Sequence, residues 1–280
     1  MTSPEGRTLR FGIVTDIHYT PEEAAGGGST LTPDLERCVS HWQQSGTEFV
    51  VQLGDLISRE GTEAEGDLLA VKAMLDRYPG PMVNVPGNHC LAVPPDRFFR
   101  IMDIPSPYHS FAIHGIRFIV LHGMDVSVLS EPENEADRHL LSYYRDVRQA
   151  PFYCGAIGSR QLHWLADELD VALRNHEPVI VLSHLPLLEE TTDVRHGLLW
   201  NHEEISDLLC RYPNVRACLS GHYHPGAYAL RCGIHFVVLP GFVTRSEHPA
   251  FACCTIDIGC GHLRVAAMDG TLLHDLAFSY

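Results

Sequence analysis

The sequence predicts an α/β fold in which two sheets pack face to face and helices cover the outside. Short apolar runs alternate with helical patterns in the first half of the chain, the last part reads as strand after strand with tight turns, and polar motifs follow the apolar runs. The 280 residues are expected to form a single domain, 1–280. A content of 45% hydrophobic and 20% charged residues is typical of a globular protein.

The first half of the chain predicts a βαβαβ unit, which implies parallel strands with right-handed crossovers and a functional site at their carboxyl ends. The expected elements are strands at 9–15, 49–53 and 82–85, a loop at 21–30, and helices from 32 onward and at 63–78. Thr32 supplies the N-cap and Pro33 the first-turn proline of the first helix. The buried helix faces are expected to carry Leu35, Val39 and Trp42 and then Leu68, Leu69, Val71, Met74 and Leu75.

The second half predicts a hairpin, two further strand and helix pairs, and a closing series of strands. The hairpin is expected at 108–122, with its turn at His114 and Gly115. Residues 123–157 are expected to hold a cap or insertion over the site, because the stretch 130–151 is polar and weakly periodic. The other expected elements are helices at 159–175 and 201–212 and strands at 178–183, 215–220, 227–239, 251–258 and 262–268. Ser159 is expected to cap the first helix, with Leu162, Leu165, Leu169 and Leu173 on its inner face.

The charge balance limits the possible partners. A net charge of −15 argues against a nucleic acid polymer, because phosphate backbones are bound by clustered Lys and Arg. Bound cations could still let such a protein take a small phosphorylated substrate.

With no secretory signal and no run of about 18 or more apolar residues, the protein is expected in the cytoplasm and not in a membrane. Its nine scattered cysteines are expected to be reduced, and the adjacent Cys253 and Cys254 to be buried.

Five polar motifs follow predicted strands and would gather at one sheet edge. They are Asp16-Ile17-His18, Gly54-Asp55, Gly87-Asn88-His89, Ser183-His184 and Gly221-His222-Tyr223-His224. One motif alone is weak evidence, since a Gly-Asp pair at a strand end is most often a turn. Together they indicate a pair of divalent ions, which need a bridging carboxylate and acidify a water into an attacking hydroxide. Mixed nitrogen and oxygen ligands favour Mn, Fe or Zn over Mg, and His89 is our candidate for protonating the leaving oxygen.

The order of these motifs resembles the calcineurin-like metallophosphoesterase superfamily over about residues 11–224. The resemblance implies a four-layer αββα sandwich and a dinuclear metal-dependent phosphohydrolase. It implies one metal ion held by Asp16, His18, Asp55 and His224, and another held by Asp55, Asn88, His184 and His222. Asp55 would be the bridge, and His89 a catalytic histidine that is not a ligand.

The second half is similar to one branch of that superfamily, the manganese-dependent ADP-ribose/CDP-alcohol diphosphatases. The matching segments are Gly155–Gly158 with Gln161, Trp164 and Leu165, then Leu199–Glu203, Gly226 with Tyr228, and Gly233–His235. The similarity implies cleavage of a phosphoanhydride or phosphodiester in a small nucleotide-like substrate. The chain differs from the branch at His18, where the branch usually carries Gln, and over residues 33–37. A cyclic nucleotide phosphodiesterase and a phosphomonoesterase stay open as alternatives, and the intact motifs argue against a non-catalytic scaffold.

Candidate substrate contacts lie outside the five motifs. Asn201 and His202 could line the substrate pocket, with His202 reaching a phosphate, and Tyr19 could stack on a base. Each also has a structural alternative, because Asn201 could only cap the following helix and Tyr19 could only fill the sheet edge. The oligomeric state is not predicted.

Overall fold

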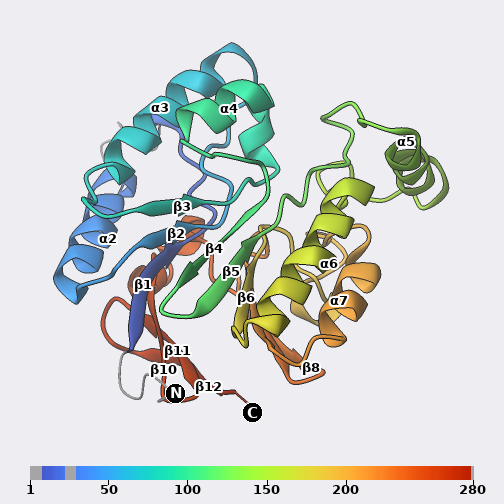
Figure 1. The fold of residues 1–280 in the computed structure, drawn as a ribbon. Coiled ribbons are helices and arrows are strands. Elements are labelled where there is room, and N and C mark those ends of the chain that lie inside the picture. Colours follow the sequence, from blue (N-terminus) through green and yellow to red (C-terminus); the bar gives the residue numbers. More distant parts are fainter. Residues whose placement is uncertain (1–7, 23–29, 279–280) are drawn as a thin grey trace.

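Two six-stranded sheets pack face to face between two layers of helices in the computed structural model, which describes residues 8–22 and 30–278 (Figure 1). The first sheet has the order β12 (Leu272–Ala277), β11 (His262–Ala267), β10 (Cys254–Gly259), β1 (Leu9–Val14), β2 (Val50–Gln52), β3 (Met82–Asn84). The second has the order β4 (His109–Ile113), β5 (Ile116–Val120), β6 (Val179–Leu182), β7 (Val215–Ser220), β9 (Ile234–Val238), β8 (Ala227–Arg231). The predicted αββα sandwich is confirmed.

Helices cover the outer face of each sheet. The first sheet is covered by α2 (Leu31–Ser45), α3 (Ala64–Leu75) and α4 (Pro95–Ile101), and the second by α6 (Ser159–Arg174) and α7 (His202–Cys210). A further helix, α5 (Glu135–Ser142), continues into a π-helix at Tyr143–Val147 and projects beyond α6 (Figure 1). No helix in the described ranges is long and apolar enough to cross a membrane.

An aromatic cluster joins the two sheets. Phe11 of β1 stacks on Phe49 with ring centroids 4.9 Å apart, and meets Phe118 of β5 edge to face at 5.7 Å. All three rings are fully buried or nearly so. Burying a side chain of this size stabilises a fold by about 1.5 to 3 kcal/mol, so these contacts help hold the two sheets together.

Parallel pairing brings the carboxyl ends of several strands to one edge. In the first sheet Val14 pairs with Gln52, which pairs with Asn84. In the second sheet Leu182 pairs with Val120 on one side and Leu219 on the other. The loops that follow these residues carry the five predicted motifs, so the register confirms that the motifs meet at one edge.

Both predicted helix caps are wrong by one or two residues. Helix α2 begins at Leu31 after Thr30, because Leu31 is completely buried and belongs to the packed face. Helix α6 has Gly158 as its N-cap. The carboxylates of Asp125 and Asp137 accept hydrogen bonds from the amides of Gly158 and Ser159, at 3.0 and 2.8 Å. Carboxylates from distant segments, and not the Ser159 hydroxyl, therefore cap the N-terminus of α6.

Two further features differ from what the sequence predicts. Leu69 and Leu173 were expected on buried helix faces, but they are 49% and 38% exposed because they lie at the margins of those faces. Strand β12 was not predicted, since its sequence mixes apolar with charged residues, and it completes an edge of the first sheet. The loop expected at 21–30 lies mostly outside the described residues.

The cysteines are not all reduced. Cys210, at the end of α7, and Cys232, in the turn between β8 and β9, form a disulfide with their Cα atoms 5.5 Å apart. The other seven cysteines are free, and all of them except Cys260 are buried. Cys253, just before β10, and Cys254, its first residue, are both buried as expected and contribute to different hydrophobic clusters. Burial raises the pKa of Cys254 to about 12, which keeps it an inert thiol.

Candidate metal centre

The motif residues occupy an unusual backbone conformation. Positive φ angles between 49° and 66° are found at Asp16, His18, Asp55 and His222. Residues other than glycine adopt this region rarely, and it persists where surrounding contacts enforce it, often at functional sites. Here the amides of Asp16 and His18 donate to the carbonyls of Gly54 and Asp55, at 3.1 and 3.0 Å. The loops after β1 and β2 thus lock each other in place.

Glycines allow these loops to approach closely. A Cβ atom on Gly54 would lie 2.3 Å from Nδ1 of His184, and one on Gly87 would lie 2.3 Å from Oδ1 of Asp55. Gly54 also has φ of 106°, which only glycine adopts freely. The glycines of two predicted motifs are therefore required by packing against the neighbouring motif.

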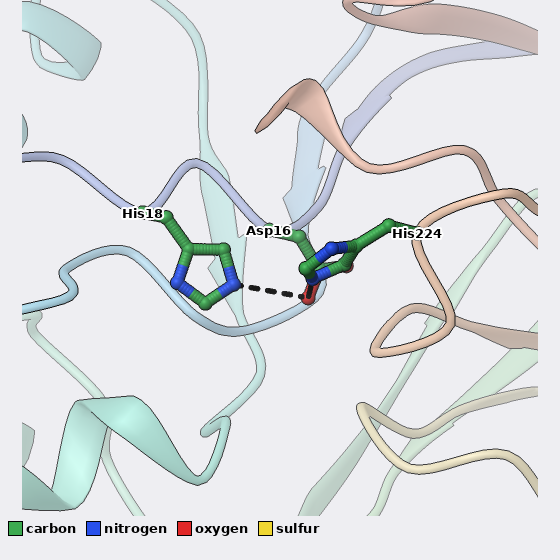
Figure 2. Close-up of side chains that lie close together, drawn as sticks. All are labelled: Asp16, His18 and His224. Atoms are coloured by element: carbon green, nitrogen blue, oxygen red, sulfur yellow. Dashed lines mark ion pairs between the residues drawn. The ribbon is translucent and has the colours of Figure 1, made fainter. Parts of the chain in front are cut away.

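Asp16, His18 and His224 form a first group that could hold a metal ion (Figure 2). Nε2 of His18 lies 3.8 Å from Oδ1 of Asp16, and Nε2 of His224 lies 3.5 Å from the same oxygen. Figure 2 shows both imidazoles beside the Asp16 carboxylate. Within the described residues, Oδ1 of Asp16 and Nε2 of His18 are buried without a hydrogen-bond partner. Buried polar atoms are normally satisfied, so these two atoms fit the ligand positions of a cation.

Asp55, His184 and His222 form a second group, and Asn88 adjoins it. Nε2 of His184 lies 3.2 Å from Oδ2 of Asp55 and 3.0 Å from Oδ1 of Asn88. The same Oδ2 of Asp55 lies 3.8 Å from Nε2 of His18 in the first group. Asp55 therefore stands between the two groups, where a carboxylate shared by two ions would be needed.

Outer contacts fix the imidazoles. Nδ1 of His184 lies 2.7 Å from the carbonyl of Leu53, and Nε2 of His222 lies 2.8 Å from the carbonyl of His196. A ring nitrogen that donates to a carbonyl carries the proton, so the opposite nitrogen is left as a ligand atom. His184 thus offers Nε2, and His222 offers Nδ1. The Asp16 carboxylate is also held by an outer contact, because the hydroxyl of Thr15 donates to its Oδ2 at 2.7 Å.

The electrostatics keep both carboxylates ionised. Burial alone would raise the pKa of Asp16, but its contacts with His18 and His224 lower it well below the usual value. Burial likewise opposes ionisation of Asp55, but the charge of His184, its hydrogen bond and the charge of His18 together lower the pKa. Burial alone would lower the pKa of His184, but the charges of Asp55 and Asp16 and the hydrogen bonds to Asp55 and Leu53 together raise it to about 9. Two buried carboxylates held ionised among imidazoles are a suitable environment for divalent ions.

His89 lies beside both groups. Its ring is 4.8 Å from that of His18, and its amide donates to Oδ1 of Asp55 at 2.9 Å. A nitrogen of His89 also falls within ligand distance of His18 and Asp55, so the ring could in principle bind a metal. The expectation that it acts as an acid and not as a ligand stays a prediction.

A cavity of about 590 Å³ opens above the two groups, within the range of roughly 300 to 1,000 Å³ typical of small-molecule sites. Motif residues form part of its lining, and the rest comes from loops elsewhere in the chain. The lining consists of His18, Asp55, Asn88, His89, His222 and His224, together with Glu60, Gly61, Leu91, Ala92, Leu129, Phe152, Tyr153, Arg195 and His196.

Residues 9–226 match the family model described as calcineurin-like phosphoesterase. This chain belongs to that family. Proteins named manganese-dependent ADP-ribose/CDP-alcohol diphosphatase are similar to it. The one from Arabidopsis thaliana is 29% identical over 87% of this chain and 86% of its own, and the one from Mus musculus is 30% identical over 86% and 85%. A dimetal phosphatase from Danio rerio shares the fold, with a TM-score of 0.82 at 21% identity and coverage of 97% and 99%.

Membership in the calcineurin-like phosphoesterase family confirms the predicted enzyme class, a metal-dependent hydrolase of phosphoric esters or anhydrides. The donor set fits this class, because it supplies two clusters of carboxylate and imidazole atoms joined at Asp55.

The three predicted substrate contacts of this phosphoesterase lie outside the cavity lining. Asn201 is buried, and its amide group exchanges two hydrogen bonds of 3.0 Å with the backbone of Ile157. Nδ1 of His202 lies 3.1 Å from the carbonyl of Leu199, and Tyr19 is 8% exposed within a hydrophobic cluster. Substrate binding by these residues stays a prediction, and each has a structural role in the fold.

The sequence motifs do not include nine of the lining residues, among them Tyr153, Arg195 and His196. The loop around Arg195 and His196 follows no regular periodicity, and a charged pair in a loop is usually a solvated surface feature. The only usable signal was its position between His184 and Asn201, after a strand that ends at the site.

The close approach of Gly87 to Asp55 yields a testable expectation. Gly87→Ala should lower the free energy of unfolding by about 1 to 3 kcal/mol and reduce metal content, because the new methyl group must displace Asp55. Gly66→Ala is the control, since that position in α3 is open and alanine should stabilise the helix by about 0.5 to 1 kcal/mol. Urea unfolding and metal analysis of both variants check this. Equal behaviour of the two variants would contradict the packing argument.

Proposed function

We propose that this phosphoesterase hydrolyses the phosphoanhydride of a small nucleoside diphosphate derivative, of the ADP-ribose or CDP-alcohol type, with manganese as its metal. The observation that carries the proposal is that both groups of ligand residues open into one cavity of small-molecule size. The names of the relatives from Arabidopsis thaliana and Mus musculus support this substrate class and this metal.

We assign the ligands of the two ions as follows. One ion would be held by Asp16, His18, Asp55 and His224, and the other by Asp55, Asn88, His184 and His222. Divalent ions at such a site polarise a phosphoryl oxygen and lower the pKa of a bound water. The carbonyls of Leu53 and His196 keep the imidazoles of His184 and His222 turned toward the ions.

The remaining steps fall to side chains around the cavity. We assign His89 as the general acid that gives a proton to the leaving phosphate oxygen, because its ring lines the cavity beside His18 and its backbone is tied to Asp55. We also propose that segment 123–157 forms part of the substrate-binding wall, since Leu129, Phe152 and Tyr153 line the cavity. Exposed apolar side chains at this position can pack against the nucleoside and exclude water.

A side-by-side substrate panel tests the proposal. Metal-stripped protein is supplied with Mn²⁺, Fe²⁺ or Zn²⁺ and given ADP-ribose, CDP-choline, cyclic AMP and para-nitrophenyl phosphate. We expect the highest kcat/KM with ADP-ribose or CDP-choline and Mn²⁺. Highest activity on cyclic AMP or on the monoester would overturn the proposed substrate class. No turnover of any substrate with any of the metals would overturn the proposed hydrolase activity.

A cytoplasmic location and the lack of a nucleic acid partner are proposed from composition. The net charge of −15 supports the lack of a nucleic acid partner. The seven free thiols support a cytoplasmic location, and the Cys210–Cys232 disulfide argues against it. Cell fractionation and a nucleic acid binding assay at low salt test the two points.

A further inference from the structure

A short loop at the mouth of the cavity is held by an unusual number of contacts. The carboxylate of Asp193 accepts hydrogen bonds from the amides of Arg195 and His196, at 2.9 and 2.8 Å. From the opposite side, the hydroxyl of Tyr153 donates to the carbonyl of Arg195. Gly197 has φ of 75°, and its carbonyl accepts from the hydroxyl of Thr192 at 2.9 Å. The backbone that carries Arg195 is therefore fixed in one place.

The same loop touches the candidate metal ligands. The carbonyl of His196 lies 2.8 Å from Nε2 of His222, and the ring of His196 lies 6.0 Å from that of His224. Arg195 therefore directly precedes His196, which lies beside one candidate ligand of each proposed ion. Arg195 also lines the cavity into which His222 and His224 open.

The guanidinium of Arg195 has no partner within the part of the chain that the structure describes. The residue is exposed, and among residues 8–22 and 30–278 its side chain forms no ion pair or hydrogen bond. Most arginines of this chain are paired, as Arg59 is with Asp67 at 2.6 Å and Arg117 with Glu177 at 2.9 Å. The cavity lining otherwise includes carboxylates and imidazoles, and among the described residues it contains no second Lys or Arg. The group is thus an available cation in a strongly acidic protein.

We propose that Arg195 binds the second phosphate of a diphosphate substrate, the one that is not attacked. Arg195 would thereby favour hydrolysis of diphosphates over hydrolysis of diesters that carry a single phosphate. The inference rests on the proposed function, because only a diphosphate places a second charged group beyond the metal ions. That phosphate would otherwise lie in a cavity bordered by Asp55 and Glu60, without a positive partner. A guanidinium is suited to the task because its planar donors match two phosphate oxygens at once.

Kinetics with two substrates test this inference. Arg195→Gln should lower kcat/KM for ADP-ribose by about 10-fold to 100-fold, the value of a hydrogen bond to a charged group, and leave bis(para-nitrophenyl) phosphate hydrolysis unchanged. Arg195→Lys should recover part of the loss by restoring the charge. Arg174→Gln is the matched control, since Arg174 is an exposed arginine at the far end of α6. An equal loss on both substrates would overturn the inference and assign Arg195 to positioning of His222 through the loop.

An inhibition measurement separates this inference from the proposed function. ADP and AMP differ by one phosphate, and both can compete with bis(para-nitrophenyl) phosphate at a fixed concentration of free Mn²⁺. We expect wild-type protein to bind ADP more tightly than AMP, and Arg195→Gln to remove that difference. If wild-type protein cleaves neither ADP-ribose nor CDP-choline but shows this pattern, the proposed function fails and the role of Arg195 stands. If it cleaves ADP-ribose and the variant keeps the preference for ADP, the role of Arg195 is refuted alone.

Discussion

Replacing His89 by alanine is expected to lower kcat about 10²-fold to 10⁴-fold while both metal ions stay bound, the range usual for loss of a general acid. The reason lies in the placement of His89, whose ring lines the cavity beside His18 and whose amide is tied to Asp55. The hydrogen bond from the amide of residue 89 to Asp55 does not depend on the side chain, so the Asp55 carboxylate should keep its position in the variant. Turnover of the best substrate and metal content per chain are measured on the same preparation.

The control for this variant is His139→Ala, because His139 is an exposed histidine on α5 outside the cavity lining. It should match the wild-type protein in both turnover and metal content. Loss of a metal ion from His89→Ala would mean that His89 is a ligand, which its distance from His18 and Asp55 permits. The proposed division of roles among the histidines would then be wrong.

Asp55→Asn is expected to abolish stable binding of the metal pair. The substitution keeps the shape of the side chain but removes the charge that lies near His18 and His184. Loss of an outer contact of a ligand commonly costs roughly 10-fold to 100-fold in metal affinity, and loss of a shared ligand should cost more. Metal analysis after gel filtration should find less than one ion per chain, and activity should fall at least as far as in His89→Ala.

Asp137→Asn is a matched control for this charge removal. Asp137 is also a buried carboxylate, but it binds the amide of Ser159 at the start of α6. Its substitution should lower the free energy of unfolding without changing metal content. If Asp55→Asn retained two ions and normal turnover, a carboxylate shared between the ions would be refuted.

The sheets and the motif positions could be predicted from the sequence because both depend on local patterns. A buried parallel strand needs a continuous apolar run, and the polar residue that follows must lie at the sheet edge. Asp16 and Asp55 follow this rule in the first sheet, and His184 and His222 follow it in the second.

The rest of the site could not be predicted because it depends on contacts between distant segments. Tyr153 meets Arg195 across 42 residues, and His196 meets His222 across 26. No local pattern encodes these pairs, just as none distinguished the Cys210–Cys232 pair from the free thiols. The sequence therefore indicated the candidate metal ligands but not the loop that adjoins them.

Crystals grown with Mn²⁺ test the central claim most directly, by the positions of manganese in an anomalous difference map. We expect two peaks on either side of the Asp55 carboxylate, one beside Asp16 and the other beside His184. A single peak, or a pair that does not share Asp55, would contradict the two-metal centre proposed for this phosphoesterase.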